Sequence, residues 1–231
     1  MLNTYAFSPS RFEAHGSAVI NGEAVGFHSI SEDNLFYDGS GKPIASIFSF
    51  SYFRDVAGNA ESRPVIFAFN GGPGSSSCML HSGFLGPRRM VFMDDVDAAS
   101  AIPPYRVQDN PECLLDIADI VLVDPVATGF GMLLDESYSE SFFGIKEDAE
   151  AFLSFVQSWL QRYGRWNSPK YIIAESYGCT RAAMAAEIAA GPGTDRCYDI
   201  TFDGIIFIGN TVTTGQYFGR EVPVEKSVIG F

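Results

Sequence analysis

The stretch "YIIAESYGCT" (residues 171–180) joins an apolar run to a segment of small residues. When a strand enters a helix through a single residue, that residue is held in a strained backbone conformation and needs small neighbours, which gives the pattern Gly-x-Ser-x-Gly. The pattern reads "AESYG" at residues 174–178, with Ala174 at the first small position. It predicts that Ser176 is a nucleophile on a sharp turn. The alternative is an ordinary serine N-cap that opens the helix.

Other apolar runs predict the sheet that carries this turn. Continuous apolar runs are typical of strands that are buried on both faces. A helical pattern between them, at residues 145–164, begins with acidic residues and ends at Gly164. Strands that alternate with helices predict an α/β fold with a mostly parallel sheet. The predicted strands of this part of the chain are residues 64–70, 118–124, 170–175 and 203–210.

The N-terminal part has a different pattern. Residues 16–55 contain short apolar or alternating runs, and turn residues separate them at Asn21-Gly22, 31–33 and 38–41. This pattern predicts an antiparallel strand meander that precedes the α/β core.

Composition excludes some classes of partner. The net charge is −13, without a run of five like charges, which disfavours nucleic acid and anionic membrane surfaces. The four cysteines show no metal-ligand spacing, and we expect neither a metal nor a cofactor. The N-terminus lacks the pattern of a signal peptide, and no stretch has the length of a membrane span. A cytoplasmic location is therefore favoured.

The loop "NGGPGSSS" (residues 70–77) follows the first predicted parallel strand. Consecutive glycines allow a sharp turn that aims backbone N–H groups outward. A P-loop would need a lysine here, and a dinucleotide fingerprint would need a third glycine. The better interpretation is an oxyanion hole. Because ligands bind beyond the carboxyl ends of parallel strands, we expect this loop, "PVATG" (125–129) and the serine turn to converge at one edge.

Several motifs occur together in a characteristic order, over about residues 64–210. They are "FAFNGGPGSSS", "HSGFLGPRR", "NPECLLDIADIVLVDPVATGFG", "FFGIKEDAEAF" and "RWNSPKYIIAESYGCTRAA". In these motifs the chain resembles the serine carboxypeptidases, a family of α/β-hydrolase exopeptidases, and the bacterial-type members in particular. Ala174 departs from the family's glycine. Ser75 stands where many secreted eukaryotic members carry a disulfide cysteine, so that disulfide is expected to be absent.

The resemblance implies the catalytic roles. Ser176 would be the acylating nucleophile, and the backbone N–H groups of Gly72 and Tyr177 would face the oxyanion. The substrate implied is the C-terminus of a peptide.

The resemblance also implies a binding site for the substrate's C-terminal carboxylate, formed by Asn70, the N–H of Gly71 and Glu175. A carboxylate beside Glu175 is favourable only if one of the two acids is protonated, because close like charges raise one pKa. We therefore expect such an enzyme to bind its substrate best in acid.

No histidine matches the general base of this family. His15, His28 and His81 all precede Ser176, whereas in this fold the acid and the histidine follow the nucleophile. We expect His15 and His28 to be ordinary residues of the meander and His81 to have a structural role.

The acidic residues that follow the nucleophile come too early to match the family's catalytic acid. The resemblance therefore implies one incomplete domain over residues 1–231: the meander at 16–55, the core at 64–210 and the start of a cap region at 211–231. The missing C-terminal half would be its partner and would supply the matching Asp and His. This chain would be inactive alone. The early acidic residues are Asp195, Asp199 and Asp203.

Two other functions remain open. A related acyltransferase or esterase would share the acyl-enzyme chemistry, although Asn70 and Glu175 together favour peptide C-termini. A truncated, non-catalytic binding domain would keep only the carboxylate site.

Overall fold

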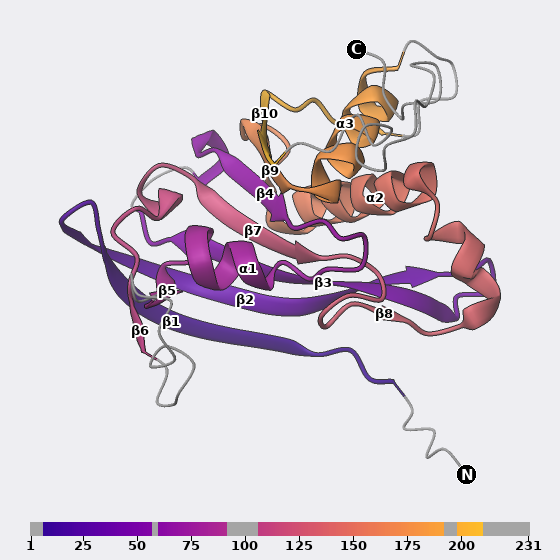
Figure 1. Cartoon of the computed structure of the whole chain (residues 1–231), viewed down its shortest axis with the longest axis horizontal. Helices are drawn as coiled ribbons and strands as arrows, with labels where there is room; N and C mark the ends of the chain where they lie inside the picture. Colours follow the sequence, from indigo (N-terminus) through magenta and orange to yellow (C-terminus); the bar gives the residue numbers. More distant parts are fainter. Residues whose placement is uncertain (1–6, 57–59, 92–105, 192–197, 210–231) are drawn as a thin grey trace, which may run out of the picture.

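The computed structural model describes residues 7–56, 60–91, 106–191 and 198–209, and within them one large mixed sheet (Figure 1). Its strands lie in the order β1-β2-β3-β7-β4-β9-β10, and β8 pairs with β3. The strands are β1 (Arg11–Ile20), β2 (Glu23–Tyr37), β3 (Pro43–Arg54), β4 (Val65–Phe69), β7 (Asp119–Asp124), β8 (Met132–Leu133), β9 (Lys170–Glu175) and β10 (Gly204–Ile208). A separate ribbon pairs β5 (Arg88–Met90) with β6 (Val107–Asp109).

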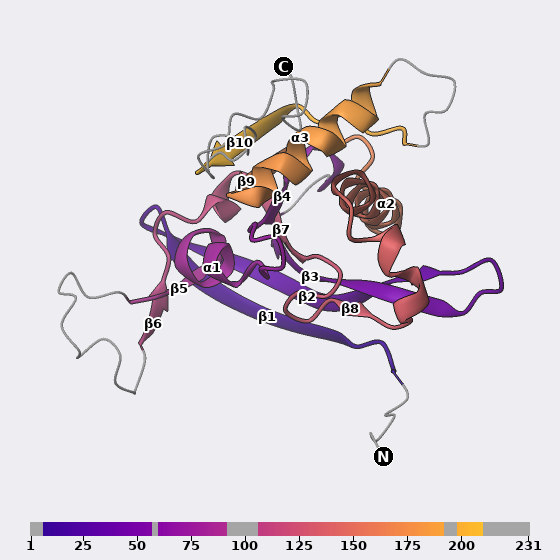
Figure 2. The same cartoon turned by 45° about the vertical axis from the view of Figure 1, so that its right-hand side comes forward.

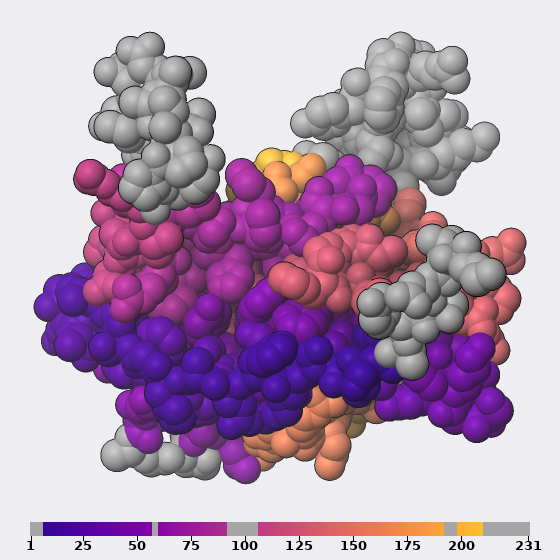
Figure 3. All heavy atoms as spheres, turned by 90° about the horizontal axis from the view of Figure 1, so that it is seen from below, coloured from indigo at the N-terminus to yellow at the C-terminus, as the bar shows by residue number. Residues whose placement is uncertain are grey.

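Strands β1, β2 and β3 form the predicted antiparallel meander. The turn at Asn21-Gly22 is confirmed, with φ of 51° and 84° at its two residues. The turn predicted at residues 38–41 is also present, because Asp38 Oδ1 accepts hydrogen bonds from the N–H groups of Ser40 and Lys42. In the space-filling view, the indigo N-terminal strands run across much of the near face (Figure 3).

The turn predicted at residues 31–33 is wrong, because β2 continues through them. Glu32 is only 4% exposed, and its side chain contacts the C-terminal end of the helix at residues 145–163. Its carboxylate accepts hydrogen bonds from Arg162 Nη1 at 2.6 Å and Tyr163 Oη at 2.8 Å, and also from Arg11. The polar triplet that resembles a turn in the sequence therefore contains a buried carboxylate within the strand, Glu32, which pairs with the partly exposed Arg11 and Arg162.

The apolar runs form the parallel half of the sheet, where β7, β4, β9 and β10 run in the same direction. Alternate side chains of β4 enter different cores: Phe67 and Phe69 pack on one face, whereas Ile66 and Ala68 pack on the other. Both faces are therefore buried, which explains the continuous apolar pattern.

Helices cover the two faces unequally (Figure 2). Helices α2 (Ile145–Tyr163) and α3 (Tyr177–Ala190) pack together on one face, and the short helix α1 (Cys78–Leu80) with the π-turn His81–Leu85 lies on the other. The predicted end of α2 is confirmed, since Gly164 closes it in the left-handed conformation at φ 63°. None of the helices in the described ranges is long and apolar enough to cross a membrane.

The sheet has a partly exposed end at β10. Within the described ranges, β10 pairs only with β9, and the side chain of Ile206 is 53% exposed.

Trp159 connects α2 to the sheet. It is fully buried, its Nε1 donates to Ser51 Oγ at 3.0 Å, and its ring meets Phe67 edge-on at 5.3 Å. We expect Trp159→Ala to lower the free energy of unfolding by about 3–5 kcal/mol because it leaves a large cavity. Trp159→Phe should lower it by about 1–3 kcal/mol because Ser51 then loses a buried partner.

Urea unfolding followed by circular dichroism measures both effects. The matched control is Trp166→Phe, because the Trp166 N–H bonds the side chain of Gln161 at the surface. This control should change stability by less than about 0.5 kcal/mol. Equal losses at the two tryptophans would contradict the assignment of Trp159 as the anchor of α2.

Candidate active site

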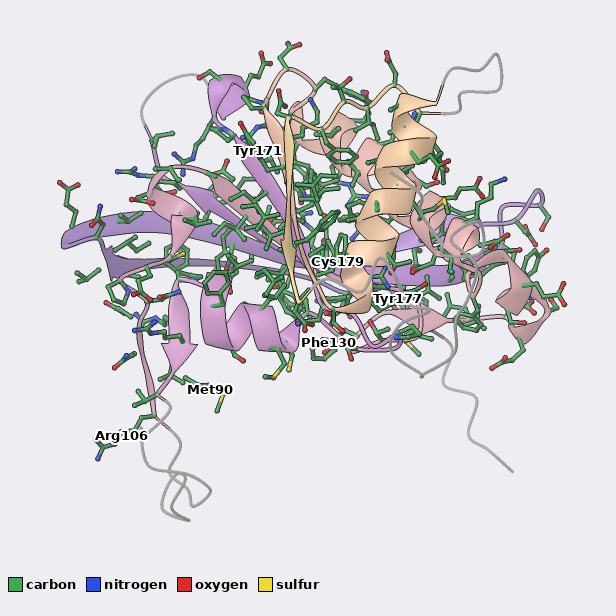
Figure 4. All side chains as sticks on the ribbon, turned by 45° about the horizontal axis from the view of Figure 1, so that its top comes forward. Met90, Arg106, Phe130, Tyr171, Tyr177 and Cys179 are labelled. Atoms are coloured by element: carbon green, nitrogen blue, oxygen red, sulfur yellow. The ribbon has the colours of Figure 1, made fainter. Side chains whose placement is uncertain are left out.

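At the carboxyl ends of three neighbouring strands, polar residues either end the strand or directly follow it. Phe69 pairs with Ala174, so Asn70 and Glu175 come level with each other directly beyond that pair. Continuing the β4–β7 register brings Asp124 level with Asn70. Figure 4 shows Tyr177 and Phe130 at this end of the strands and Tyr171 at the opposite end. The predicted convergence of the three loops is confirmed.

Ser176 occupies the sharp turn between β9 and α3. Its backbone has φ 56° and ψ −127°, a conformation that is strained for a residue with a side chain. An N-cap serine would have extended dihedrals and a side-chain bond to the helix, and the Ser176 side chain makes no capping bond. The turn is held from outside, because the Ser176 N–H donates to the Ile208 carbonyl of β10 at 2.8 Å. The geometry is therefore that of a nucleophile elbow rather than a cap.

Gly71 lies directly against this elbow. A Cβ added at Gly71 would come within 2.3 Å of the Tyr177 backbone N and 2.7 Å of the Glu175 carbonyl oxygen. Gly178 makes the converse contact, since its Cβ would lie 3.0 Å from the Asn70 carbonyl oxygen. The glycine loop and the elbow therefore fit together because Gly71 lacks a side chain, and a Cβ at Gly178 would also be in tight contact. From the sequence, the N–H of Gly71 was predicted to bind the substrate's carboxylate, but this steric requirement for glycine was missed.

Gly72 and Gly74 shape the exposed part of the loop. Their φ values are 107° and 96°, which favour glycine. The Ser75 N–H donates back to the Gly71 carbonyl at 3.1 Å and closes the turn. Through Gly71, the loop that contains Gly72 touches the backbone at Tyr177. The two proposed oxyanion donors thus belong to segments that are in direct contact.

Asn70 and Glu175 form a hydrogen-bonded pair. Asn70 is 4% exposed, and its Oδ1 accepts the Leu80 N–H at 3.1 Å, which sets the orientation of the amide. Its Nδ2 donates to Glu175 Oε2 at 3.1 Å. With Gly71 beside them, the three residues predicted to bind a carboxylate lie together.

Asp124 has a role that the sequence interpretation missed. It is 2% exposed, and its Oδ1 accepts from both the N–H and the hydroxyl of Ser77, at 2.7 and 2.6 Å. Its Oδ2 accepts from the Phe130 N–H at 3.2 Å. A Cβ at Gly129 would lie 2.1 Å from that same oxygen. Asp124 therefore ties the end of the glycine loop to the loop after β7. The sequence feature that could have indicated this role is the position of Asp124, directly after a continuous apolar run.

A cleft of about 510 Å³ opens beside the elbow. Its lining is mostly apolar, and Asp148 and Arg181 contribute the charged groups. Burial and the neighbouring negative charge of Asp148 raise the pKa of Tyr177 to about 12. The apolar and aromatic residues of the lining include Pro73, Val126, Phe142, Phe143, Ile145 and Tyr177.

The histidines lie away from the elbow. His15 is on β1 and His28 on β2, and three strands separate β2 from β9. His81 lies behind the glycine loop, where its Nε2 is 2.7 Å from Tyr52 Oη and its ring packs on Phe50. Among the described residues, no group of three His, Cys, Asp or Glu side chains could hold a metal ion.

Comparison with known protein families gives a match over most of the chain. The family model described as serine carboxypeptidase matches residues 45–221. This range includes all six residues predicted to form the site.

Individual relatives agree with this match. Serine carboxypeptidase-like 33 of Arabidopsis thaliana is 27% identical over 75% of this chain and 35% of its own length. Serine carboxypeptidase 1 of Hordeum vulgare is 25% identical over 74% of this chain and 33% of its own length. The chain thus spans about a third of the length of these curated relatives.

A solved structure shows the same fold. The prohormone-processing carboxypeptidase Kex1Δp of Saccharomyces cerevisiae superposes with a TM-score of 0.55 at 17% identity, covering 79% of this chain and 38% of that one. Together with the mixed sheet described above, this match confirms the predicted α/β-hydrolase fold.

Gly71→Ala tests the contact between loop and elbow. The new methyl group would overlap backbone atoms on both sides of Ser176, so we expect a loss of about 1–3 kcal/mol in the free energy of unfolding. Gly39→Ala is the matched control, because a Cβ there meets nothing within 4 Å. Urea unfolding that showed the same stability for both variants would refute the steric assignment.

His81 predicts a pH dependence of stability. Burial lowers the pKa of His81 below its ordinary value of 6.5, so below that pH the unfolded chain binds more protons than the folded one. The stability from the neutral imidazole is fully present above pH 6.5, and it is lost as the pH falls through the lowered pKa. The Tyr52 hydroxyl lies 2.7 Å from His81 Nε2 and can donate a hydrogen bond to this nitrogen when it is unprotonated.

We expect the stability difference between the wild-type protein and His81→Gln to shrink from pH 7.5 to pH 5, because glutamine does not titrate. Urea midpoints across this range measure the difference. A difference that stayed constant or grew in acid would show that His81 is not held neutral by the fold.

Proposed function

Because the chain belongs to the serine carboxypeptidase family, we propose that its site belongs to a serine-type carboxypeptidase that removes C-terminal residues from peptides through an acyl-enzyme. The observation that carries the proposal is the Asn70–Glu175 pair, hydrogen-bonded at 3.1 Å immediately beside Ser176. An exopeptidase needs both a nucleophile and a group that recognises the free C-terminus. This edge of the sheet offers the two together.

In the proposed reaction, Ser176 Oγ attacks the carbonyl carbon of the last peptide bond. The N–H groups of Gly72 and Tyr177 stabilise the oxyanion, and the loss of one such donor typically costs about 3 kcal/mol in the transition state. The amine of the C-terminal residue leaves, and water then hydrolyses the acyl-serine. The strained backbone of Ser176 supports this role, because such strain persists where the surroundings enforce it and it concentrates at functional sites.

A general base must activate Ser176. The bonding and strand positions of the chain's three histidines argue against each of them. We assign the base and its acidic partner to the portion of the relatives' length that these residues do not span. On this proposal, the present chain binds peptide C-termini but turns them over poorly.

The C-terminal carboxylate of the substrate would contact Asn70, the Gly71 N–H and Glu175. Two carboxylates at contact distance share one proton, because close like charges prevent both from ionising. Peptide binding should therefore be tighter in acid.

Peptide binding to the isolated chain tests the proposal without requiring turnover. We expect an N-blocked dipeptide with a free C-terminus to bind at least about 10-fold more tightly than its C-terminal amide, because the amide loses charge-assisted hydrogen bonds. Binding of the free acid, measured by calorimetry, should strengthen from pH 7.5 to pH 5. Glu175→Gln should flatten this dependence, since glutamine offers an N–H without titrating.

Equal affinity for acid and amide would reject the carboxypeptidase assignment and favour an esterase or acyltransferase. A fluorophosphonate probe separates these enzymes from a binding domain, with Ser176→Ala as the control. Labelling of Ser176 shows a reactive nucleophile. A chain that binds the free acid but resists the probe retains only the recognition function.

A further inference from the structure

Arg181 is a buried cation one helical turn beyond the elbow. Only 2% of the residue is exposed, and buried arginines need partners for their donors. Its Nε lies 2.9 Å from each carboxylate oxygen of Asp148, near the start of α2. Its Nη1 donates to the backbone carbonyl of Asn70 at 3.2 Å. One side chain thus connects α3, α2 and the first residue of the glycine loop.

The flat guanidinium also lies against two aromatic rings. Its central carbon is 5.0 Å from the Phe69 ring centroid and 5.6 Å from that of Tyr177, distances at which a cation is attracted to a ring face. Phe69 ends β4, and Tyr177 directly follows the nucleophile. Arg181 therefore contacts both segments that carry the proposed oxyanion donors.

These contacts matter because the two donors come from distant parts of the sequence. Gly72 lies on the loop after β4, whereas Tyr177 begins α3. Such donors must be held within about 0.5 Å of their working positions by surrounding groups whose own conformations are locked. Gly71 allows the two segments to touch, but it offers no side chain to hold them together. Arg181 supplies polar and aromatic contacts on both sides of that junction.

We propose that Arg181 is a positioning residue, which sets the separation between the glycine loop and the elbow through Asn70, Phe69 and Tyr177. This inference rests on the acyl-transfer site proposed above. The role depends on a planar group with several donors in fixed directions, so lysine cannot perform it although it keeps the charge. Asp148 holds the guanidinium group of Arg181 in place, and the Asp148 side chain is only 16% exposed.

The chain contains a second buried pair that serves as a matched control. Arg165 Nη1 lies 2.6 Å from Asp119 Oδ2, and each side chain is only 3% exposed. Asp119 begins β7, whereas the candidate site lies beyond the opposite end of that strand. Arg165→Lys should therefore perturb a comparable pair without touching the site.

The kinetics of Ser176 labelling by a fluorophosphonate provide the first test. We expect Arg181→Lys to lower the maximal labelling rate constant by about 100-fold, the effect of a displacement near 1 Å, with half-saturation unchanged within about 2-fold. Asp148→Asn, a milder change, should act in the same direction. Arg165→Lys should label like the wild-type protein. Equal rates in the Arg181 and Arg165 variants would overturn the proposal.

Amide hydrogen exchange provides a second test that needs no reactive serine. The N–H of Ser75 bonds the Gly71 carbonyl, so its exchange reports the order of the glycine loop. Exchange at Ser75 should accelerate in Arg181→Lys and Asp148→Asn but not in Arg165→Lys. Unchanged exchange in both site variants would also overturn the proposal. If the wild-type protein resists labelling, the acyl chemistry fails for this chain, while the exchange result still decides the role of Arg181.

Discussion

The close contact between Gly71 and the backbone around Ser176 is the constraint on which the site depends. With a Cβ at Gly71 only 2.3 Å from the Tyr177 nitrogen, no side chain fits there. Because Gly71 has no side chain, the backbone of the loop after β4 packs directly against the backbone of the turn after β9. The residues proposed as nucleophile, oxyanion donors and carboxylate-binding groups then fall within one small region, although more than a hundred residues separate Asn70 from Glu175 along the chain. The parallel register of β4 and β9 brings the two segments level.

Buried charges serve different purposes at the two ends of the parallel strands. At the start of β7, Asp119 binds Arg63 and Arg165 and joins loops that carry no site residue. At the opposite end, Asp124 binds backbone N–H groups of two loops, and Arg181 binds the Asn70 carbonyl. A buried ion pair contributes little net stability once desolvation is counted, but it orients its neighbours in defined directions. At the site, the Arg181–Asp148 pair contacts the loops that are proposed to bind the substrate.

Local patterns in the sequence predict much of this molecule because the features concerned are short-range. Continuous apolar runs identify the parallel strands, Asn21-Gly22 identifies a hairpin turn, and Gly164 identifies the end of α2. The error at Glu32 has the same origin. A polar triplet in a strand resembles a turn unless its partners, which lie about 130 residues later in α2, are known. Asp124 and Arg181 were missed because most of their partners, both side chains and backbone groups, lie on other segments.

The sequence by itself determined the α/β class, the family resemblance and the residues that could form the site, because these depend on composition, periodicity and motif. Only the tertiary structure decided how those residues meet. It showed that Ser176 has the dihedrals of a strained elbow rather than those of an N-cap. It also showed that position 71 requires glycine, because any side chain there would overlap the backbone at Tyr177. It further showed that Asp124 and Arg181 form hydrogen bonds with the converging loops. The physical reason is that steric exclusion and hydrogen bonding act across space, between segments whose separation along the chain bears no relation to their distance in the fold.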